Sequence, residues 1–414
     1  MSRKNLCTLL ILWFLIHPLL AEGKEPFALT LSEALKLAGE QNPDLLAGRQ
    51  ELEIVRGRLV KAQYPIPFNP EINSGGARRS FGSGPGGSND FEITLSQELE
   101  VAGQRTKRIE EATHNLAKVT QQVKDTERLT LAQVKDAFFR NLYLKKRLEL
   151  FQDVETLNRR LRDIAALRFQ AGDVPKMDVN VAEVRLGQSR KDTIVAGRDS
   201  QNALRELERL LGLEPEGRIG PTGTLTVKPQ VFQEDRLLHV AMENRPDLQA
   251  VTIEQKRVEA EIALTRRLIV PNPTLQAFYR EEEGGDTIIG SALTFPLPFF
   301  DRKQAELTQL AGRKSQARYE QQSVELRIQQ EVRDAFRSYE AAREEVAVFE
   351  TEVLDRAAEN FQLMETAYRE GKINLLQVVV VQNDLVNAQF SYVDSLWNYW
   401  LAHTALERAV GQDL

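Results

Sequence analysis

The sequence has few of the side chains that perform catalysis or bind metals. It holds one cysteine and four histidines among 414 residues. The cysteine, Cys7, lies in an N-terminal segment that we expect to be removed, so the mature chain has no disulfide, no reactive thiol and no cysteine for lipid attachment. His114, His239 and His403 lack a histidine or cysteine at metal-ligand spacing, and His17 falls in the same N-terminal segment. Serine-nucleophile motifs and phosphate-binding glycine loops are absent, so we expect no enzyme activity and no cofactor.

Long hydrophobic runs are also scarce. Beyond the N-terminus, no segment has the roughly 18 consecutive apolar residues of a transmembrane helix. The N-terminus combines basic Arg3 and Lys4 with an apolar stretch over residues 6–16, which is typical of a secretory signal peptide, residues 1–21, cleaved near Ala21. A membrane anchor is the alternative, but it needs a longer apolar run. Removing the signal leaves 52 basic and 60 acidic residues, a formal charge of −8, which argues against nucleic-acid binding.

Proline and glycine are missing from residues 104–168, a run of 65 residues. Apolar residues recur there every three or four positions from Val119 onwards, which places them on one stripe of a helix. At about 1.5 Å per residue, this helix is roughly 100 Å long. Because it cannot fit inside a compact domain, it must pack lengthwise against other long helices. The segment R-F-Q-A-G-D-V-P-K-M-D, residues 168–178, ends it, and a second helix returns towards residue 212.

Two pairs of segments predict β-hairpins. Apolar and polar side chains alternate strictly over residues 91–99, which indicates a strand. Residues 71–79 are expected to pair with it across a glycine- and serine-rich stretch, whose residues 75–87 we interpret as a flexible loop. Residues 275–280 and 287–295 form a second candidate hairpin. The acidic run between them is interpreted as a solvated loop, with cation attraction at a pore mouth as the alternative.

The chain repeats itself at an offset of 198 to 203 residues. The matched landmarks are P-D-L at 43 and 246, N-P at 69 and 272, D-A-F at 136 and 334, an aromatic-x-x-Gly turn at 169 and 368, and an aliphatic–Gly pair at 211 and 410. Each half reads helix, two strands, long helix, break, helix. We therefore expect a first repeat over residues 22–212, a linker over residues 213–233 and a second repeat over residues 234–414.

This pattern has a physical consequence for assembly. Four strands are too few to close a β-barrel, and an open sheet edge cannot face lipid because its backbone groups would stay unpaired. If the strands cross a membrane, several chains must therefore contribute to one barrel. Two long hairpins per chain, packed against those of neighbouring copies, would likewise form a hollow cylinder. The alternative is a small soluble sheet that caps a helical bundle.

The duplicated pattern resembles the TolC-type outer-membrane efflux protein family over essentially the whole mature chain. The segments that show the resemblance are E-Q-N-P-D-L, P-N-P-T-L, F-P-L-P-F-F-D-R, R-F-Q-A-G-D-V and Y-R-E-G-K. The P-N-P-T-L and P-L-P-F-F-D-R segments are most similar to the cobalt–zinc–cadmium branch of that family. The resemblance implies a mainly α-helical fold with a membrane β-barrel. In it, a homotrimer builds a twelve-stranded barrel in the outer-membrane lipid and a twelve-helix α-barrel through the periplasm.

The resemblance also implies a function and partners. The protein would be a passive channel that needs no cofactor and meets a periplasmic adaptor protein and an inner-membrane transporter, typically a proton-driven one. Divalent heavy-metal ions are the first substrate hypothesis, resting on the branch resemblance alone. A small-molecule or drug conduit of the same family is the alternative. A soluble periplasmic coiled-coil adaptor is the rival from another class, although an adaptor has no need of lipid-facing strands.

By position, the breaks at residues 168–178 and 368–377 become the turns at the periplasmic end of the tunnel, where the resemblance implies the adaptor contact and the gate. Helix termination alone is their alternative role. The candidate residues are Phe169, Gly172, Asp173, Pro175, Asp178, Tyr368, Arg369, Gly371, Lys372 and Gln377. Relatives with an acidic ring carry aspartates just after the second turn, where this chain has Gln377 and Val380. Asp178 is the acid at a matching place, either as a ring in three copies or as a helix N-cap.

The ring hypothesis predicts the effect of Asp178→Asn. If three copies of Asp178 attract cations, the substitution removes their charge and lowers the cation preference of the channel. Single-channel recordings in a salt gradient measure this preference as a shift of the reversal potential towards zero. Asp199→Asn, on the return helix, is the control and should leave the potential unchanged. An unchanged reversal potential for Asp178→Asn would remove the ring hypothesis.

Overall fold

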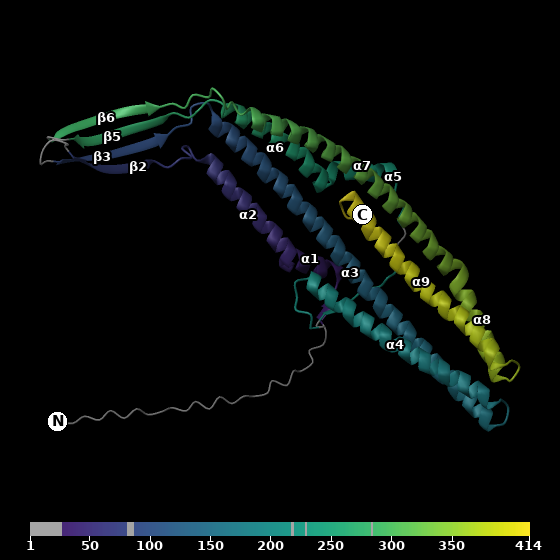
Figure 1. Cartoon of the computed structure of the whole chain (residues 1–414). Helices are drawn as coiled ribbons and strands as arrows, with labels where there is room; N and C mark the ends of the chain where they lie inside the picture. The colour runs from purple at the N-terminus through teal and green to yellow at the C-terminus, as the bar shows by residue number, and fades with distance from the viewer. Residues whose placement is uncertain (1–26, 81–86, 217–218, 228–229, 283–284) are drawn as a thin grey trace, which may run out of the picture.

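The computed structural model describes residues 27–80, 87–216, 219–227, 230–282 and 285–414. The predicted signal peptide lies outside the described residues. A four-stranded sheet lies at one end of the molecule, and long helices run from it to two turns at the other end (Figure 1). None of the described helices has both the length and the apolar composition that crossing a bilayer requires.

The sheet contains both predicted hairpins. Its order is β2-β3-β5-β6, with every neighbouring pair antiparallel. The strands are β2 (Glu71–Ser80), β3 (Gly87–Glu98), β5 (Thr274–Glu282) and β6 (Asp286–Thr294). The expectation of a loop over residues 75–87 is wrong at its start. Gly75 and Gly76 lie in β2 opposite Glu92 and Phe91, because backbone pairing needs no side chain.

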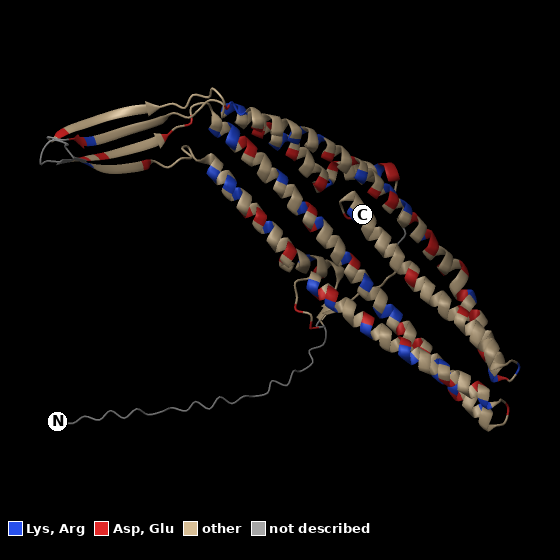
Figure 2. Cartoon of the chain, viewed as in Figure 1, with Lys and Arg blue, Asp and Glu red and all other residues tan. Residues whose placement is uncertain are grey.

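The alternation in β3 sorts side chains between the two faces of the sheet. Phe91, Ile93 and Leu95 are all exposed, whereas Ser96 is buried. On the opposite face, Glu92 pairs with Arg280 of β5 at 3.0 Å. The sheet therefore presents apolar side chains outward on one face, and Figure 2 shows that most charged residues lie on the helices instead.

The helices of the first half follow the predicted pattern closely. They are α1 (Leu31–Gln41), α2 (Pro43–Gln63), α3 (Gln104–Gln170) and α4 (Lys176–Leu210). Thr30 caps α1 through a capping box, in which the Glu33 backbone N–H donates to Thr30 Oγ1 at 3.3 Å and the Thr30 N–H donates to Glu33 Oε2 at 2.8 Å. The predicted 65-residue helix is confirmed as α3, which has 67 residues.

The second half differs in its long arm. Its helices are α5 (Glu234–Asn244), α6 (Pro246–Arg267), α7 (Gln304–Val348), α8 (Leu354–Arg369) and α9 (Leu375–Val410), with a π-helical turn η1 (Phe349–Val353) between α7 and α8. The periodicity predicts one unbroken arm, and η1 corrects this. The offset between the halves grows from 198 at Asp334 to 199 at Tyr368, so this arm has one extra residue. A π turn accommodates that residue by bonding i to i+5.

The segment predicted as a linker, residues 213–233, packs against both halves. Its strand β4 (Ile219–Pro221) pairs in parallel with β1 (Phe27–Leu29) near the start of the described chain. Ile219 and Leu225 belong to the main hydrophobic core. Short strands of three residues carry too little periodicity to be found in the sequence.

The duplication is visible in equivalent hydrogen bonds. Asn42, which caps α2, donates through Nδ2 to the Leu210 carbonyl at the end of α4 at 2.7 Å. Arg245, at the matching position before α6, donates through Nη1 to the Ala409 carbonyl at the end of α9 at 3.0 Å. Both side chains are buried. Each half therefore ties the end of its return helix to the junction between its first two helices.

Gly212 predicts a test of this junction. Its φ is +74°, and a Cβ there would lie 2.3 Å from the Gln41 carbonyl oxygen. We expect Gly212→Ala to destabilise the fold by about 2–4 kcal/mol, measured by thermal unfolding of the detergent-solubilised protein. Gly187→Ala is the matched control, because Gly187 lies within α4 and its added Cβ meets no atom within 4 Å. This control should be neutral or stabilising by about 0.5–1 kcal/mol. Equal melting temperatures for the two variants would contradict the packing argument.

Candidate periplasmic tip

Both turns at the far end of the helices use the same backbone motif. After α3, Gly172 has φ +83°, its N–H donates to the Phe169 carbonyl at 3.0 Å, and the Asp173 N–H donates to the Arg168 carbonyl at 2.9 Å. After α8, Gly371 has φ +76° and its N–H donates to the Tyr368 carbonyl at 3.0 Å, while the Lys372 N–H donates to the Ala367 carbonyl at 2.9 Å. These are Schellman motifs, which require a left-handed residue at the helix end. Both glycines therefore supply the left-handed residue that each sharp turn requires.

The side chain of Arg168, at the first turn, contacts Tyr368 at the second turn. Arg168 Nη1 donates to the Tyr368 carbonyl at 3.3 Å, and its guanidinium carbon lies 5.0 Å from the centre of the Tyr368 ring. Tyr368 itself is fully buried. Burial raises the pKa of its phenol above the usual value; Arg168 opposes this shift and Asp178 adds to it. The phenol therefore stays neutral, and its ring offers Arg168 a cation–π surface.

A small apolar core lies beside these turns. It joins α3 and α4 of the first hairpin to α8 and α9 of the second and is separate from the main core of the molecule. Its buried members are Leu161, Ala165, Ala182, Phe361, Tyr368, Leu375, Val378 and Val379. A buried polar pair lies along the same interface, where Gln382 Nε2 donates to Asn158 Oδ1 at 2.9 Å. The two hairpins of one chain therefore form a single packed unit at the tip.

The structure assigns local roles to several predicted site residues. Asp178 is not an N-cap. Pro175 occupies that position, and Asp178 lies in the first turn of α4 with its N–H donating to the Pro175 carbonyl. An acid there still complements the positive end of the helix dipole. Gln377 completes a capping box with Asn374, which gives it a structural partner at the start of α9.

The other predicted residues lie on the outer surface of the tip. Phe169, Asp173 and Arg369 are exposed, and Lys372 forms an exposed ion pair with Glu370 at 2.6 Å. Sequence reasoning missed a set of exposed aliphatic side chains around them, which are Leu167, Met177, Val184, Leu363 and Leu376. A signal for Met177 and Val184 was available, because they interrupt the charged and polar sequence of α4.

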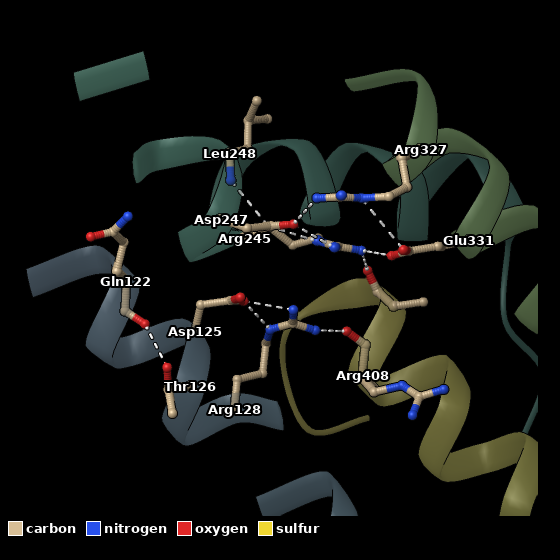
Figure 3. Close-up of polar contacts among 11 residues, drawn as sticks. Gln122, Asp125, Thr126, Arg128, Arg245, Asp247, Leu248, Arg327, Glu331 and Arg408 are labelled. Carbon is tan, nitrogen blue, oxygen red and sulfur yellow. Dashed lines mark hydrogen bonds and ion pairs between the residues drawn. The ribbon is translucent and has the colours of Figure 1, made fainter. Parts of the chain in front are cut away.

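A second polar cluster lies at mid-length (Figure 3). Arg245 bonds to Asp247 at 2.7 Å and also pairs with Glu331. Arg128 bonds to Asp125 and to the Arg408 carbonyl of α9. No sequence motif marks the residues of this cluster. Each of its buried charges has a partner, and the cluster ties α3, α6, α7 and α9 together. Across the described part of the chain, no group of three or more His, Cys, Asp or Glu side chains is placed to hold a metal ion.

A sheet with an apolar outer face, joined to helical hairpins about 100 Å long, is the arrangement expected of a channel-type protein of the cell envelope. Residues 34–213 and 237–412 match the outer membrane efflux protein family, and the chain belongs to this family. It is therefore an efflux channel protein of the outer membrane with a long periplasmic helical extension. The predicted TolC-type family and mainly α-helical fold class are confirmed.

Individual relatives agree with this assignment. The cobalt-zinc-cadmium resistance protein CzcC of Cupriavidus metallidurans is 26% identical over 389 residues, covering 93% of this chain and 90% of CzcC. The pyoverdine export outer membrane protein OpmQ of Pseudomonas putida is 24% identical, covering 92% of this chain and 85% of OpmQ. Among solved structures, the CmeC outer membrane channel of Campylobacter jejuni superposes with a TM-score of 0.78 at 14% identity, covering 92% of this chain and 85% of CmeC.

The contact between the two turns predicts the effect of Arg168→Ala. Losing the cation–π contact and the hydrogen bond should weaken the attachment of the second turn by about 1–2 kcal/mol. We expect a higher open probability in planar-bilayer recordings, with Arg168→Lys giving an intermediate value. Arg159→Ala is the control, because Arg159 pairs with Glu155 of its own helix, at 2.8 Å. If Arg168→Ala and Arg159→Ala record alike, the contact does not restrain the tip.

Proposed function

We propose that three copies of this chain form an outer-membrane efflux conduit that works with a periplasmic adaptor and an inner-membrane, proton-driven transporter. The observation that supports it best is the open sheet. Among the described residues, β2 and β6 each pair with one strand, so both edges keep unpaired backbone groups. In lipid such edges are too costly to leave open, and pairing β6 of one copy with β2 of the next satisfies them. Three copies supply twelve strands, enough for a closed barrel.

The helical domain supports the same assembly. Exposed aliphatic side chains continue along both hairpins, such as Ile194 of α4 and Leu326 of α7. Lengthwise contact between hairpins of neighbouring copies would bury such residues in an α-barrel. The turns at the tip, with Phe169, Gly172 and Asp173 in one and Tyr368 and Gly371 in the other, then surround the periplasmic opening.

The exposed aliphatic side chains around the turns are suited to contact with the adaptor protein. Met177 and Leu376 lie in the first turns of α4 and α9 with most of their surface accessible. Exposed apolar groups at a polar helix end mark protein–protein contacts. The gate and the adaptor contact therefore share the tip in this proposal, with Arg168 restraining the gate from inside the chain.

Divalent heavy-metal ions are the proposed substrate class. The support is the name of the relative CzcC, a cobalt-zinc-cadmium resistance protein. A conduit needs no ligand cluster, since it conducts what the pump delivers. A small-molecule cargo is the second candidate, favoured by the similarity to the pyoverdine export protein OpmQ.

The proposed function is tested by deleting the gene and restoring it. The deletion strain should accumulate more cobalt, zinc and cadmium, measured by elemental mass spectrometry, and should become more sensitive to them. Wild-type protein should reverse both effects. Unchanged metal levels together with retention of organic compounds would replace metals by the small-molecule cargo. A purified protein that remains monomeric in mild detergent would overturn the conduit itself.

A further inference from the structure

The sheet joins the helices through two segments with the same five-residue pattern, aromatic–Pro–aliphatic–Pro–Phe. They are Y-P-I-P-F at residues 64–68 and F-P-L-P-F at residues 295–299, hereafter the aromatic–proline segments. The first leads into β2 and the second leaves β6, so they flank the two edge strands of the sheet. They do not correspond to each other in the internal duplication. The pattern therefore reflects a shared location at the helical end of the edge strands.

Both segments expose large apolar side chains. Tyr64 and Phe68 are exposed in the first segment, as are Leu297 and Phe299 in the second, and the following Phe300 is 93% exposed. Their prolines lack a backbone N–H, so these irregular stretches leave fewer unpaired donors than ordinary loops. Each segment is continuous along the chain with an edge strand of the sheet. Strands of 9–10 residues fit the height of a membrane-spanning barrel, which places the segments at one membrane–water boundary.

Arginines lie directly against these segments. Arg105 Nη2 donates to the Gln63 carbonyl at 3.0 Å, next to the first segment. Arg302 Nε donates to the Pro298 carbonyl within the second segment at 3.3 Å. Arg266 and Arg267, at the end of α6, add two more exposed guanidinium groups at the same end of the helices. Figure 2 shows basic residues gathered at the helix ends next to the sheet.

These arginines differ from those further along the helices in their partners. Within the described ranges of the chain, Arg105, Arg266, Arg267 and Arg302 form no ion pair with a carboxylate. Arg257, deeper in the helical domain, pairs with three carboxylates at 2.9 to 3.0 Å. Arg105 and Arg302 therefore place cations without a carboxylate partner beside exposed aromatic rings, and the surface has an apolar side and a cationic side.

We propose that this surface binds an anionic glycerophospholipid of the membrane leaflet nearest the helices. Its acyl chains contact Tyr64, Phe68, Phe299 and Phe300, and Arg105 and Arg302 hold the headgroup phosphate. Guanidinium groups bind phosphate in bidentate geometry, and aromatic side chains favour the membrane interface. The inference rests on the proposed assembly in one respect. When β6 of one copy pairs with β2 of the next, the two aromatic–proline segments become neighbours, so each site spans two copies and three copies hold three lipids.

Native mass spectrometry of the full-length protein in mild detergent tests the site, with dioleoyl-phosphatidylglycerol as the anionic probe and dioleoyl-phosphatidylcholine as the zwitterionic one. We expect three retained phosphatidylglycerol molecules per trimer and little phosphatidylcholine. Arg105→Gln with Arg302→Gln should weaken phosphatidylglycerol binding about 30-fold, because each arginine contributes about 1 kcal/mol and the two contributions add. Arg236→Gln with Arg356→Gln, two exposed arginines on α5 and α8, removes the same charge and should change nothing.

A second variant separates the apolar contribution from the cationic one. Phe300→Ser removes an exposed ring without disturbing the core, and should weaken both lipids alike. The proposal is overturned if the two double-arginine variants bind phosphatidylglycerol equally, or if both lipids bind wild-type protein with the same affinity. Channel conductance and trimer mass report on the proposed function independently. A protein that forms a conducting trimer yet binds phosphatidylglycerol equally in the two double-arginine variants would overturn the lipid site and keep the proposed function.

Discussion

The lengthwise packing of α3 is the constraint on which the rest of the structure depends. A helix of 67 residues has no globular interior to enter, so its apolar stripe is buried only where other helices lie along it. α2 and α6 cover its sheet-proximal part, α9 its middle and α4 the part that reaches the tip. The long helices therefore run alongside α3 (Figure 1). The distance between the sheet and the turns follows from the length of this one helix, and that distance suits a conduit across the periplasm.

The two halves share one plan but stabilise it with different chemistry. Asn42 and Arg245 occupy matching positions and bond to matching carbonyls, yet only Arg245 is charged and recruits Asp247 and Glu331. Gly212 and Gly411 also match, with positive φ at the end of each return helix. The second long arm differs by its one-residue insertion, which produces η1. Divergence after duplication has therefore left the backbone plan intact and changed how its junctions are held.

The candidate site was predictable in its backbone and not in its contacts. Gly172 and Gly371 stand out because helices end at a left-handed residue, a rule that acts over five or six residues. The contact between Arg168 and Tyr368 joins residues 200 positions apart, so no local pattern reveals it. The role of Asp178 could not be predicted from its sequence position alone. Its acidity near a helix start suggested an N-cap, but α4 begins at Lys176 and Pro175 takes that place.

The sequence by itself determined the long helices, the two hairpins and their order, although not β1, β4 or η1. These patterns are properties of neighbouring residues or of the chain compared with itself, so they can be recognised without knowing the fold. They are helix periodicity, strand alternation, proline and glycine breaks and the internal repeat. Only the tertiary structure decided which elements touch. The sheet order β2-β3-β5-β6, the pairing of β1 with β4 across the predicted linker, and the separate apolar core at the tip all join segments far apart in the chain. Such pairings are selected by the burial of apolar surface and by backbone hydrogen bonds over the whole molecule, and no short stretch of sequence encodes them.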